Sequence, residues 1–418
     1  MPIPGCSRRL LMVAVLGGAS ALRADEPLRI ETYVEIVLRS HPAMQAARAL
    51  DESATAEKLG ARLLADPTLE VSVGRGRSTT EPSERGTETS FALSQTIPWF
   101  PARAAAIDAA DHAAQARRAE ASASRWSLAI DARLAFYRVV EARALVEVAS
   151  ATEADARSLL DLVSRRASLG ETREVDRIKA RVEWLKQQRE MRVAEREADA
   201  AEATLRTLAA SPLSQPLLLS GELSRPLDAL NILREATPDR LERSPEALRA
   251  RAEAARAASL LESARRSRVP DLGFSLFRQK EVDREAFGAS LGIVLPLWNA
   301  RRGDIARAGA ESMLRTADAD RIRLTLLTVI ETRRRDVDTS AAQAAILMNE
   351  LVPSAAESLR LARLLFDEGE TSLLDLLDAQ RTARDARREE IRARFELAVA
   401  LSELRRLLGP GDIRGRNE

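Results

Sequence analysis

Histidine and cysteine, the residues that most often build catalytic and metal centres, are scarce in this 418-residue chain. Its two histidines, His41 and His112, are far apart, and neither has carboxylates at the helical spacing typical of a zinc site. The segment "VGRGR" at 73–77 is similar to a fragment of a phosphate loop, but a hairpin-end loop explains it better because no helix follows. No nucleophile elbow is present. We therefore expect no enzymatic activity, no catalytic residue, no cofactor and no metal ligand.

Two aspartates have a spacing that suits another kind of chemistry. Asp375 and Asp378 are three positions apart in a predicted helix, so they share one helix face. If several copies of the chain met there, the carboxylates would form acidic rings that attract cations. On helix electrostatics alone, the favoured interpretation is that they are solvated acids near a helix N-terminus.

The elements that would position these aspartates come from an internal duplication. The segment "QTIPWFPAR" at 95–103 returns as "IVLPLWNAR" at 293–301, and "LGETREVD" at 169–176 returns as "EGETSLLD" at 368–375. Self-similarity of this kind predicts a repeated structural unit. Each half is predicted to contain a helix, two strands, a very long helix, a tight turn and another helix. The predicted boundaries are a signal peptide at 1–24, a first repeat at 25–210, a linker or equatorial region at 211–243, a second repeat at 244–409 and a C-terminal tail at 410–418.

Each repeat contains a predicted β-hairpin, at 67–97 and at 271–295. Apolar residues alternate with small or polar ones, as in Leu272, Phe274 and Leu276. Strands of about ten residues are long enough to cross a membrane when tilted. From the strands alone, soluble hairpins packed on helices are the favoured interpretation, because the barrel signal of a single strand is weak. The four predicted strands are Pro67–Gly76, Glu88–Ile97, Asp271–Lys280 and Ala286–Leu295.

The long helices form predicted helical hairpins. From 103 to 169 the chain has no proline and no glycine, and a helix of that length would run roughly 100 Å. Apolar residues three and four apart, with many alanines, indicate coiled-coil-like packing. Gly170 and Gly369 are predicted to end long helices in the left-handed conformation, with Thr172 and Thr371 capping the helices that follow. Pro353 should kink or break the second long helix.

The N-terminus has the layout of a secretory signal peptide. Arg8 and Arg9 precede an apolar run that is too short for a comfortable transmembrane helix. The only cysteine, Cys6, lies before that run and would be removed with it, which leaves no disulfide. The net charge is +1, so no electrostatic field favours nucleic acid. With 30% charged and 3% aromatic residues, the composition is typical of long helices.

Strand edges decide between the two interpretations of the hairpins. An isolated hairpin in a bilayer would leave N–H and C=O groups unpaired in hydrocarbon, and four strands are too few to close a barrel. Several chains must therefore pool their strands. The strand–helix junctions at Pro98 and Pro296 would end strand pairing, and the neighbouring Trp99 and Trp298 would lie at the membrane interface. Plain junction packing explains the tryptophans equally well.

Taken together, these segments resemble the TolC-like outer membrane efflux proteins of Gram-negative bacteria. The resemblance rests on "ADPTLEVSVG", "ETSFALSQTIP", "FGASLGIVLPLWNARRGDIARA" and "DEGETSLLDLLDAQRTARDA", and it is greatest to the outer components of cobalt–zinc–cadmium type systems. It implies a mainly α-helical, duplicated fold with four transmembrane strands per chain and a barrel closed by trimerisation. It also implies an outer-membrane channel that extends into the periplasm and passes substrate, heavy-metal cations among them.

The resemblance also assigns partners and site residues. The partners are two further copies of the chain, a periplasmic adaptor, a proton-driven inner-membrane pump and outer-membrane lipid. Asp375 and Asp378 match the paired aspartates of the family's periplasmic constriction, whereas the first repeat has Asp176 but Lys179 at the second position. The adaptor-contacting turns match two tips: Gly170, Glu171 and Thr172, and Gly369, Glu370 and Thr371.

A secreted coiled-coil scaffold or a periplasmic adaptor remains the alternative. An adaptor usually has one helical hairpin flanked by Gly- and Val-rich β domains. This chain instead predicts two helical hairpins and four short strands.

Overall fold

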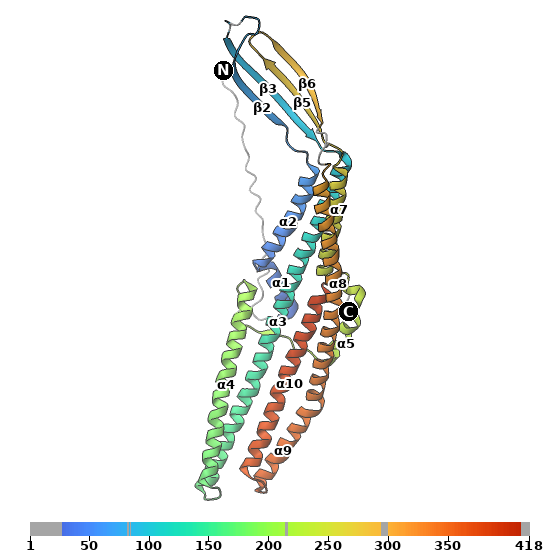
Figure 1. Cartoon of the computed structure of the whole chain (residues 1–418). Helices are drawn as coiled ribbons and strands as arrows, with labels where there is room; N and C mark the ends of the chain where they lie inside the picture. The colour runs from blue at the N-terminus through green and yellow to red at the C-terminus, as the bar shows by residue number, and fades with distance from the viewer. Residues whose placement is uncertain (1–26, 82, 84, 214–215, 294–299, 411–418) are drawn as a thin grey trace, which may run out of the picture.

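A computed structural model describes residues 27–81, 83, 85–213, 216–293 and 300–410. The predicted signal peptide at 1–24 and the junction residues Pro296 and Trp298 lie outside the described residues. The molecule is elongated, with a β-sheet at one end and long helices that run from it to two tips at the other end (Figure 1). This is the mainly helical fold with a small antiparallel sheet that the sequence predicts.

The elements follow the duplicated order. The first half contains α1 (Ile30–Ser40), α2 (Ala43–Arg62), β2 (Thr68–Arg77), β3 (Arg85–Ile97), α3 (Phe100–Ser168) and α4 (Glu174–Ala209). The second half contains α7 (Pro245–Arg266), β5 (Leu272–Lys280), β6 (Glu285–Ile293), α8 (Arg302–Ile346), α9 (Val352–Glu368) and α10 (Leu373–Leu408). Between them lie β4 (Leu219–Ser220), α5 (Pro226–Glu235) and α6 (Pro238–Leu241).

A short parallel pairing of β1 (Leu28–Arg29) with β4 was not predicted. It ties the segment that enters the first repeat to the segment that leaves it. The pair is only two residues long, too short for a periodic signal in the sequence.

The four long strands form one antiparallel sheet in the order β2–β3–β5–β6. The two hairpins are joined side by side, because β3 pairs with β5 along the run from Thr89↔Lys280 to Ile97↔Leu272. The predicted start of the second strand, Glu88, was wrong, since Arg85 already pairs with Arg77. The segment "VGRGR" at 73–77, predicted as a loop at the hairpin end, also pairs with β3 and so forms the end of β2.

Apolar side chains gather on one face of this sheet. The register places Leu69, Leu93 and Leu276 opposite one another across three strands. These side chains are exposed, and Leu69 keeps 64% of its surface accessible. The opposite face carries small and polar side chains, for example the pairs Ser94↔Ser275 and Ser275↔Ser290.

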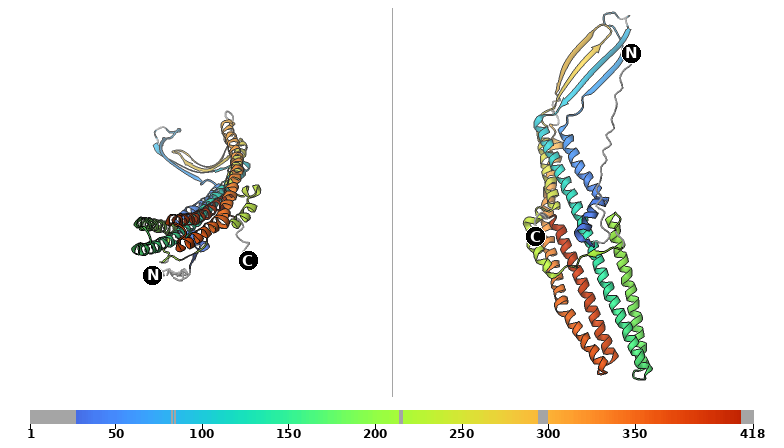
Figure 2. Two further views of the ribbon diagram at one scale, coloured as in Figure 1. Left: turned by 90° about the horizontal axis from the view of Figure 1, so that it is seen from below. Right: turned by 180° about the vertical axis from the view of Figure 1, so that it is seen from behind.

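The helices form two successive tiers, with α3 running through both. Near the sheet, α2, α3, α7 and α8 lie in that order; toward the tips the order is α4, α3, α10, α9 (Figures 1 and 2). Viewed along the long axis, the helices form an open arc (Figure 2). Among the described residues, no helix has both the length and the apolar character to cross a membrane.

Three buried apolar clusters hold the tiers together. The first joins α1, α3 and α4 around Tyr33 and Phe136, whose ring centroids are 6.2 Å apart. The second packs α5 and α6 against α8 and α10, with Ile330 and Leu401 at its centre. The third lies near the tips. It contains Val163 of α3 and Phe366 of α9, so it contacts both helical hairpins.

The second long helix changes its hydrogen bonding next to Pro353, where the sequence predicts a kink or a break. A π-helical stretch at Leu347–Leu351 separates α8 from α9, and Pro353 lies in the first turn of α9. Proline has no N–H to donate, so the hydrogen-bond ladder shifts by one residue just before it. The helix continues into the tip with this local change of register.

Candidate functional site

Both helical hairpins turn at the tip with the same backbone geometry. Gly170 and Gly369 have φ values of 79° and 80°, in the left-handed region that glycine adopts without strain. In each tip the next N–H bonds back five residues: Glu171 N donates to Arg166 O at 2.9 Å and Glu370 N to Leu365 O at 2.8 Å. This closes each helix with the same C-terminal motif. The predicted role of the two glycines is confirmed.

The prediction that Thr172 and Thr371 cap the helices after the tips was wrong. α4 begins after Arg173 without a side-chain cap, so Thr172 does not cap it. α10 is capped by Ser372, whose Oγ accepts a hydrogen bond from Asp375 N at 3.3 Å, while the Asp375 carboxylate accepts one from Ser372 N at 3.2 Å. Thr371 adds an O–H donor to the same carboxylate at 3.0 Å. Serine and threonine are adjacent here, and only the backbone conformation decides which of them caps the helix.

The two aspartates at the start of α10 have different surroundings. Asp375 is exposed, and the hydroxyl of Ser372 holds the pKa of its carboxyl below the ordinary value, with help from Thr371. Asp378 is also exposed, and within the described part of the chain it makes no hydrogen bond or ion pair. Asp375 is therefore both a helix cap and a negative charge, whereas Asp378 carries a charge alone.

The first hairpin neutralises its matching acid. Asp176 is buried and accepts one hydrogen bond from Arg173 Nε at 3.1 Å, and Lys179 Nζ lies 3.7 Å from its carboxylate. The two cations cancel the single negative charge. The two tips are thus asymmetric at this position, because the acid of the first hairpin is paired with cations and Asp375 of the second is held only by hydroxyl and backbone donors.

Charged side chains tie the two hairpins together above the tips. Arg388 of α10 donates to Glu190 of α4 at 2.8 Å, and Arg384 lies 3.7 Å from Glu183. Arg363 of α9 pairs with Asp155 of α3. The sequence analysis missed these contacts, because ion pairs 200 or so residues apart leave no local pattern, as the separation of 208 for Arg363 and Asp155 illustrates.

The first strand–helix junction is fixed by a contact with the second repeat. Pro98 follows the last residue of β3, and Trp99 is the residue before α3. The backbone N–H of Trp99 donates to the Asp271 carboxylate, which precedes β5, at 2.9 Å. Trp99 itself is half-buried. This contact links the ends of both hairpins where the sheet meets the helices.

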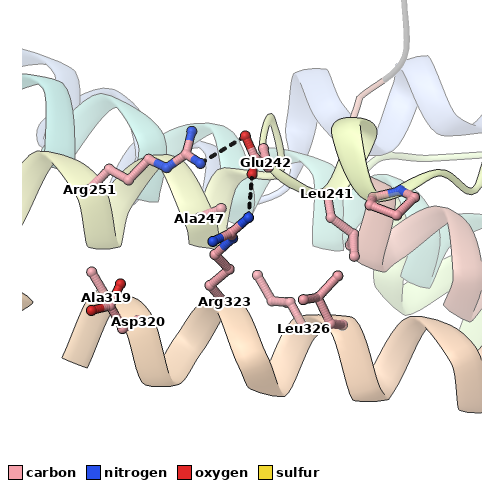
Figure 3. Close-up of a pocket in the computed structure, with 10 residues that line it drawn as sticks. Leu241, Glu242, Ala247, Arg251, Ala319, Asp320, Arg323 and Leu326 are labelled. Atoms are coloured by element: carbon pink, nitrogen blue, oxygen red, sulfur yellow. Dashed lines mark ion pairs between the residues drawn. The ribbon is translucent and has the colours of Figure 1, made fainter. Parts of the chain in front are cut away.

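A pocket of about 280 Å³ lies where α6 meets α7 and α8 (Figure 3). Glu242 forms ion pairs with Arg251 at 2.9 Å and with Arg323 at 3.3 Å, and Leu241 and Leu326 also line the pocket. Arg251 holds the pKa of the Glu242 carboxyl below its ordinary value. Across the described ranges, no three His, Cys, Asp or Glu side chains lie where they could hold a metal ion.

The fold and the tips together define a class of protein built from a small antiparallel sheet and duplicated helical hairpins. The chain belongs to the outer membrane efflux protein family, whose model matches residues 34–211 and 237–410. A cobalt-zinc-cadmium resistance protein, CzcC of Cupriavidus metallidurans, is 27% identical over 400 residues, covering 92% of this chain and 91% of the relative.

Solved structures share the fold. The outer membrane protein VceC of Vibrio cholerae has a TM-score of 0.74 at 18% identity. The alignment covers 91% of this chain and 96% of VceC. The open state of the MtrE outer membrane channel of Neisseria gonorrhoeae has a TM-score of 0.71 at 18% identity, with 92% and 89% covered.

Family membership establishes the general function. The protein is a non-enzymatic efflux channel of the outer membrane that extends into the periplasm and works in a tripartite system. Channels of this family are trimeric.

Proposed function

We propose that three copies of this chain close one twelve-stranded outer-membrane barrel, continued by a periplasmic helical tunnel, and that the channel exports heavy-metal cations. Each chain supplies four strands, and three times four gives the twelve. The apolar face of the sheet contacts lipid and the small, polar face lines the lumen. The observation that carries this proposal is the pattern of exposed apolar residues at the open edges of every tier.

The outermost helices expose the apolar residues that a neighbouring chain would cover. In the tier near the sheet these are Leu59 on α2, Leu63 just after it, and Met313 and Leu324 on α8. In the tier near the tips they are Val175, Ile178 and Val182 on α4, and Leu361 and Leu364 on α9. Large apolar side chains left exposed on the outer helices are expected where a partner covers them. Both tiers would close in the same rotational sense, α8 of one chain against α2 of the next, and α9 against α4.

The sheet needs the same closure. β2 and β6 each pair on one side only, so each presents a row of unpaired backbone groups. Unpaired N–H and C=O groups cost several kcal/mol each in hydrocarbon. Pairing β2 of one chain with β6 of the next removes the edges of all three sheets at once.

Heavy-metal cargo is proposed from the relative and from the tip electrostatics. CzcC is named as a cobalt-zinc-cadmium resistance protein, and the similarity extends over nearly the whole chain. Three copies of Asp375 and Asp378 would form two acidic rings at the periplasmic constriction. Such rings attract cations and oppose the passage of anions.

The tips are the proposed contact with the rest of the system. Residues 170–172 and 369–371 would meet a periplasmic adaptor, which connects the channel to a proton-driven pump in the inner membrane. A groove between the two tips, bordered by Arg166, Asp176 and Phe366, supplies both charged and apolar contacts for such a partner.

Cysteine cross-linking tests the barrel. The predicted mature chain has no cysteine, since Cys6 lies in the signal peptide. A chain with Val71→Cys on β2 and Leu291→Cys on β6 carries one thiol at each free edge. In outer-membrane fractions, a flexible bis-maleimide should then give a covalent trimer. Each single variant has one thiol per chain, so its largest cross-linked product should be a dimer.

The matched control places both thiols in the middle of the sheet. Leu93 and Leu276 are paired in register, so Leu93→Cys with Leu276→Cys should link within one chain and give no larger species. A ladder beyond three chains, or the absence of any intermolecular product from the edge pair, would refute the closed trimer. Recovery of the protein as a soluble periplasmic monomer would favour the scaffold alternative instead.

A further inference from the structure

One large aromatic side chain lies on the wrong face of the sheet for contact with lipid. Leu272, Phe274 and Leu276 of β5 share the apolar face, and strand alternation puts Phe277 on the opposite face with Ser275. Phe277 is half-buried, although no helix packs on the sheet (Figures 1 and 2). Its own sheet must therefore shield part of the ring.

The register identifies what lies beside the ring. Phe277 is paired with Ala92 on β3 and with Gly288 on β6, and Ala92 is in turn paired with Glu70 on β2. One row of paired residues thus crosses all four strands. Of the two direct neighbours of Phe277 in this row, Ala92 has only a methyl group and Gly288 has no side chain.

Gly288 provides the space in which the ring lies. A Cβ atom added at Gly288 would fall 2.6 Å from Cζ of Phe277 and 3.0 Å from Cε1, well inside van der Waals contact. The ring therefore lies flat across the glycine, against the sheet. An alanine there could be accommodated only if the end of the phenylalanine side chain moved away from the sheet, because strand pairing fixes the backbone on both sides.

We infer that Phe277 and Gly288 together set the bore of the barrel: Gly288 keeps the Phe277 ring flat on the inner wall, and the channel is wide at this level for that reason. The inference rests on the proposed trimeric barrel, in which the small and polar face is the lumen. Three symmetry-related Phe277 rings then lie at one level of the lumen, and each chain has a Glu70 carboxylate two strands away in the same row. The ring would interact through its face with cations as they pass.

Substitution of Gly288 tests this directly. In Gly288→Ala the ring must stand away from the wall, so we expect a narrower bore. The measurement is the largest polyethylene glycol that enters from the extracellular side of channels in planar bilayers, because entry from that side reports on the barrel whatever the width of the periplasmic end. We expect a smaller exclusion size for Gly288→Ala than for the native protein, and a larger one for Phe277→Ala.

Gly292→Ala is the matched control. Gly292 lies on the same strand and the same face, but a Cβ there would only meet Gly273 O at 3.9 Å, an ordinary contact. Its exclusion size should equal that of the native protein. The double variant Gly288→Ala with Phe277→Ala should regain at least the native exclusion size, since no ring remains to be displaced. A general folding defect from the added methyl group would not be rescued in this way.

The outcomes separate this inference from the proposed function. If the native protein forms no channel, the proposed barrel itself fails. If the native protein forms channels but Gly288→Ala matches Gly292→Ala and the native protein in exclusion size, the bore is set elsewhere and this inference alone is refuted. An unchanged exclusion size in Phe277→Ala would refute it equally, because the ring would then not line the lumen.

Discussion

The ties between the two helical hairpins predict how easily the periplasmic end widens. Arg388 on α10 and Glu190 on α4 form the clearest of them, with a distance of 2.8 Å and side chains that are 34% and 31% exposed. Arg388→Ala removes the contact without touching the apolar cluster below. We expect the second hairpin to swing away from the first more readily in this variant.

The magnitude follows from the exposure of the pair. A partly exposed ion pair contributes about 0.5–1 kcal/mol. If the three chains widen together, three lost pairs amount to roughly 1.5–3 kcal/mol, which changes an equilibrium between narrow and wide states about 10- to 150-fold. The fraction of time that single channels spend at their highest conductance level in planar bilayers should therefore rise steeply.

Arg360→Ala is the control for this measurement. Arg360 pairs with Glu357 at 2.8 Å, but both residues belong to α9, so the pair does not connect the hairpins. Its loss should leave the conductance levels unchanged. Exchanging the charges, Arg388→Glu with Glu190→Arg, should restore native behaviour. An Arg388→Ala channel with native open times, or an equal effect of Arg360→Ala, would refute the idea that this tie restrains widening.

Three further predictions concern the tip and the buried interior. Asp378→Asn removes an exposed charge and no hydrogen bond. The reversal potential in a salt gradient should therefore show weaker cation selectivity, while heat stability is unchanged. Asp375→Asn should lower both the cation selectivity and the heat stability, because it also weakens the cap of α10. Burial raises the pKa of the Glu141 carboxyl, so the folded state disfavours its ionised form. The folded protein therefore loses stability as the pH rises above the pKa that the Glu141 carboxyl has in the unfolded chain. Glu141→Gln should for this reason raise the heat-dissociation temperature of the trimer at neutral pH but not at pH 4. Phe136→Ala empties a fully buried site and should cost about 3–5 kcal/mol, seen as a lower dissociation temperature; an unchanged temperature would mean that the first apolar cluster does not support the assembly.

The elements that could be predicted from sequence are those with local causes. The run without proline or glycine after Arg103 became α3, which begins only three residues earlier, at Phe100. Helical spacing of apolar residues depends on contacts within a few turns, so it is visible in the sequence. The left-handed tip glycines follow from local backbone sterics in the same way. The duplication made each assignment stronger, since both copies had to obey the same pattern.

The features that were missed depend on distant partners or on backbone detail. Whether Thr371 or Ser372 caps α10 is decided by the backbone conformation of Ser372, with φ −81° and ψ 157°. The extension of β3 back to Arg85 depends on the partner strand, which offers Arg77 for pairing. The tie between Arg388 and Glu190 joins residues 198 positions apart, and the sequence carries no sign of it. The proposed roles of Asp375 and Asp378 in the pore stay predictions.

The number of chains in the membrane-embedded particle tests the central claim most directly. Native mass spectrometry of the signal-cleaved protein, extracted from outer membranes in mild detergent, should give the mass of three chains and nothing smaller until the sample is heated. A single-chain mass for protein that stays dispersed without detergent and does not associate with lipid vesicles would contradict the account, because the exposed strand edges and outer helix faces would then need no neighbours.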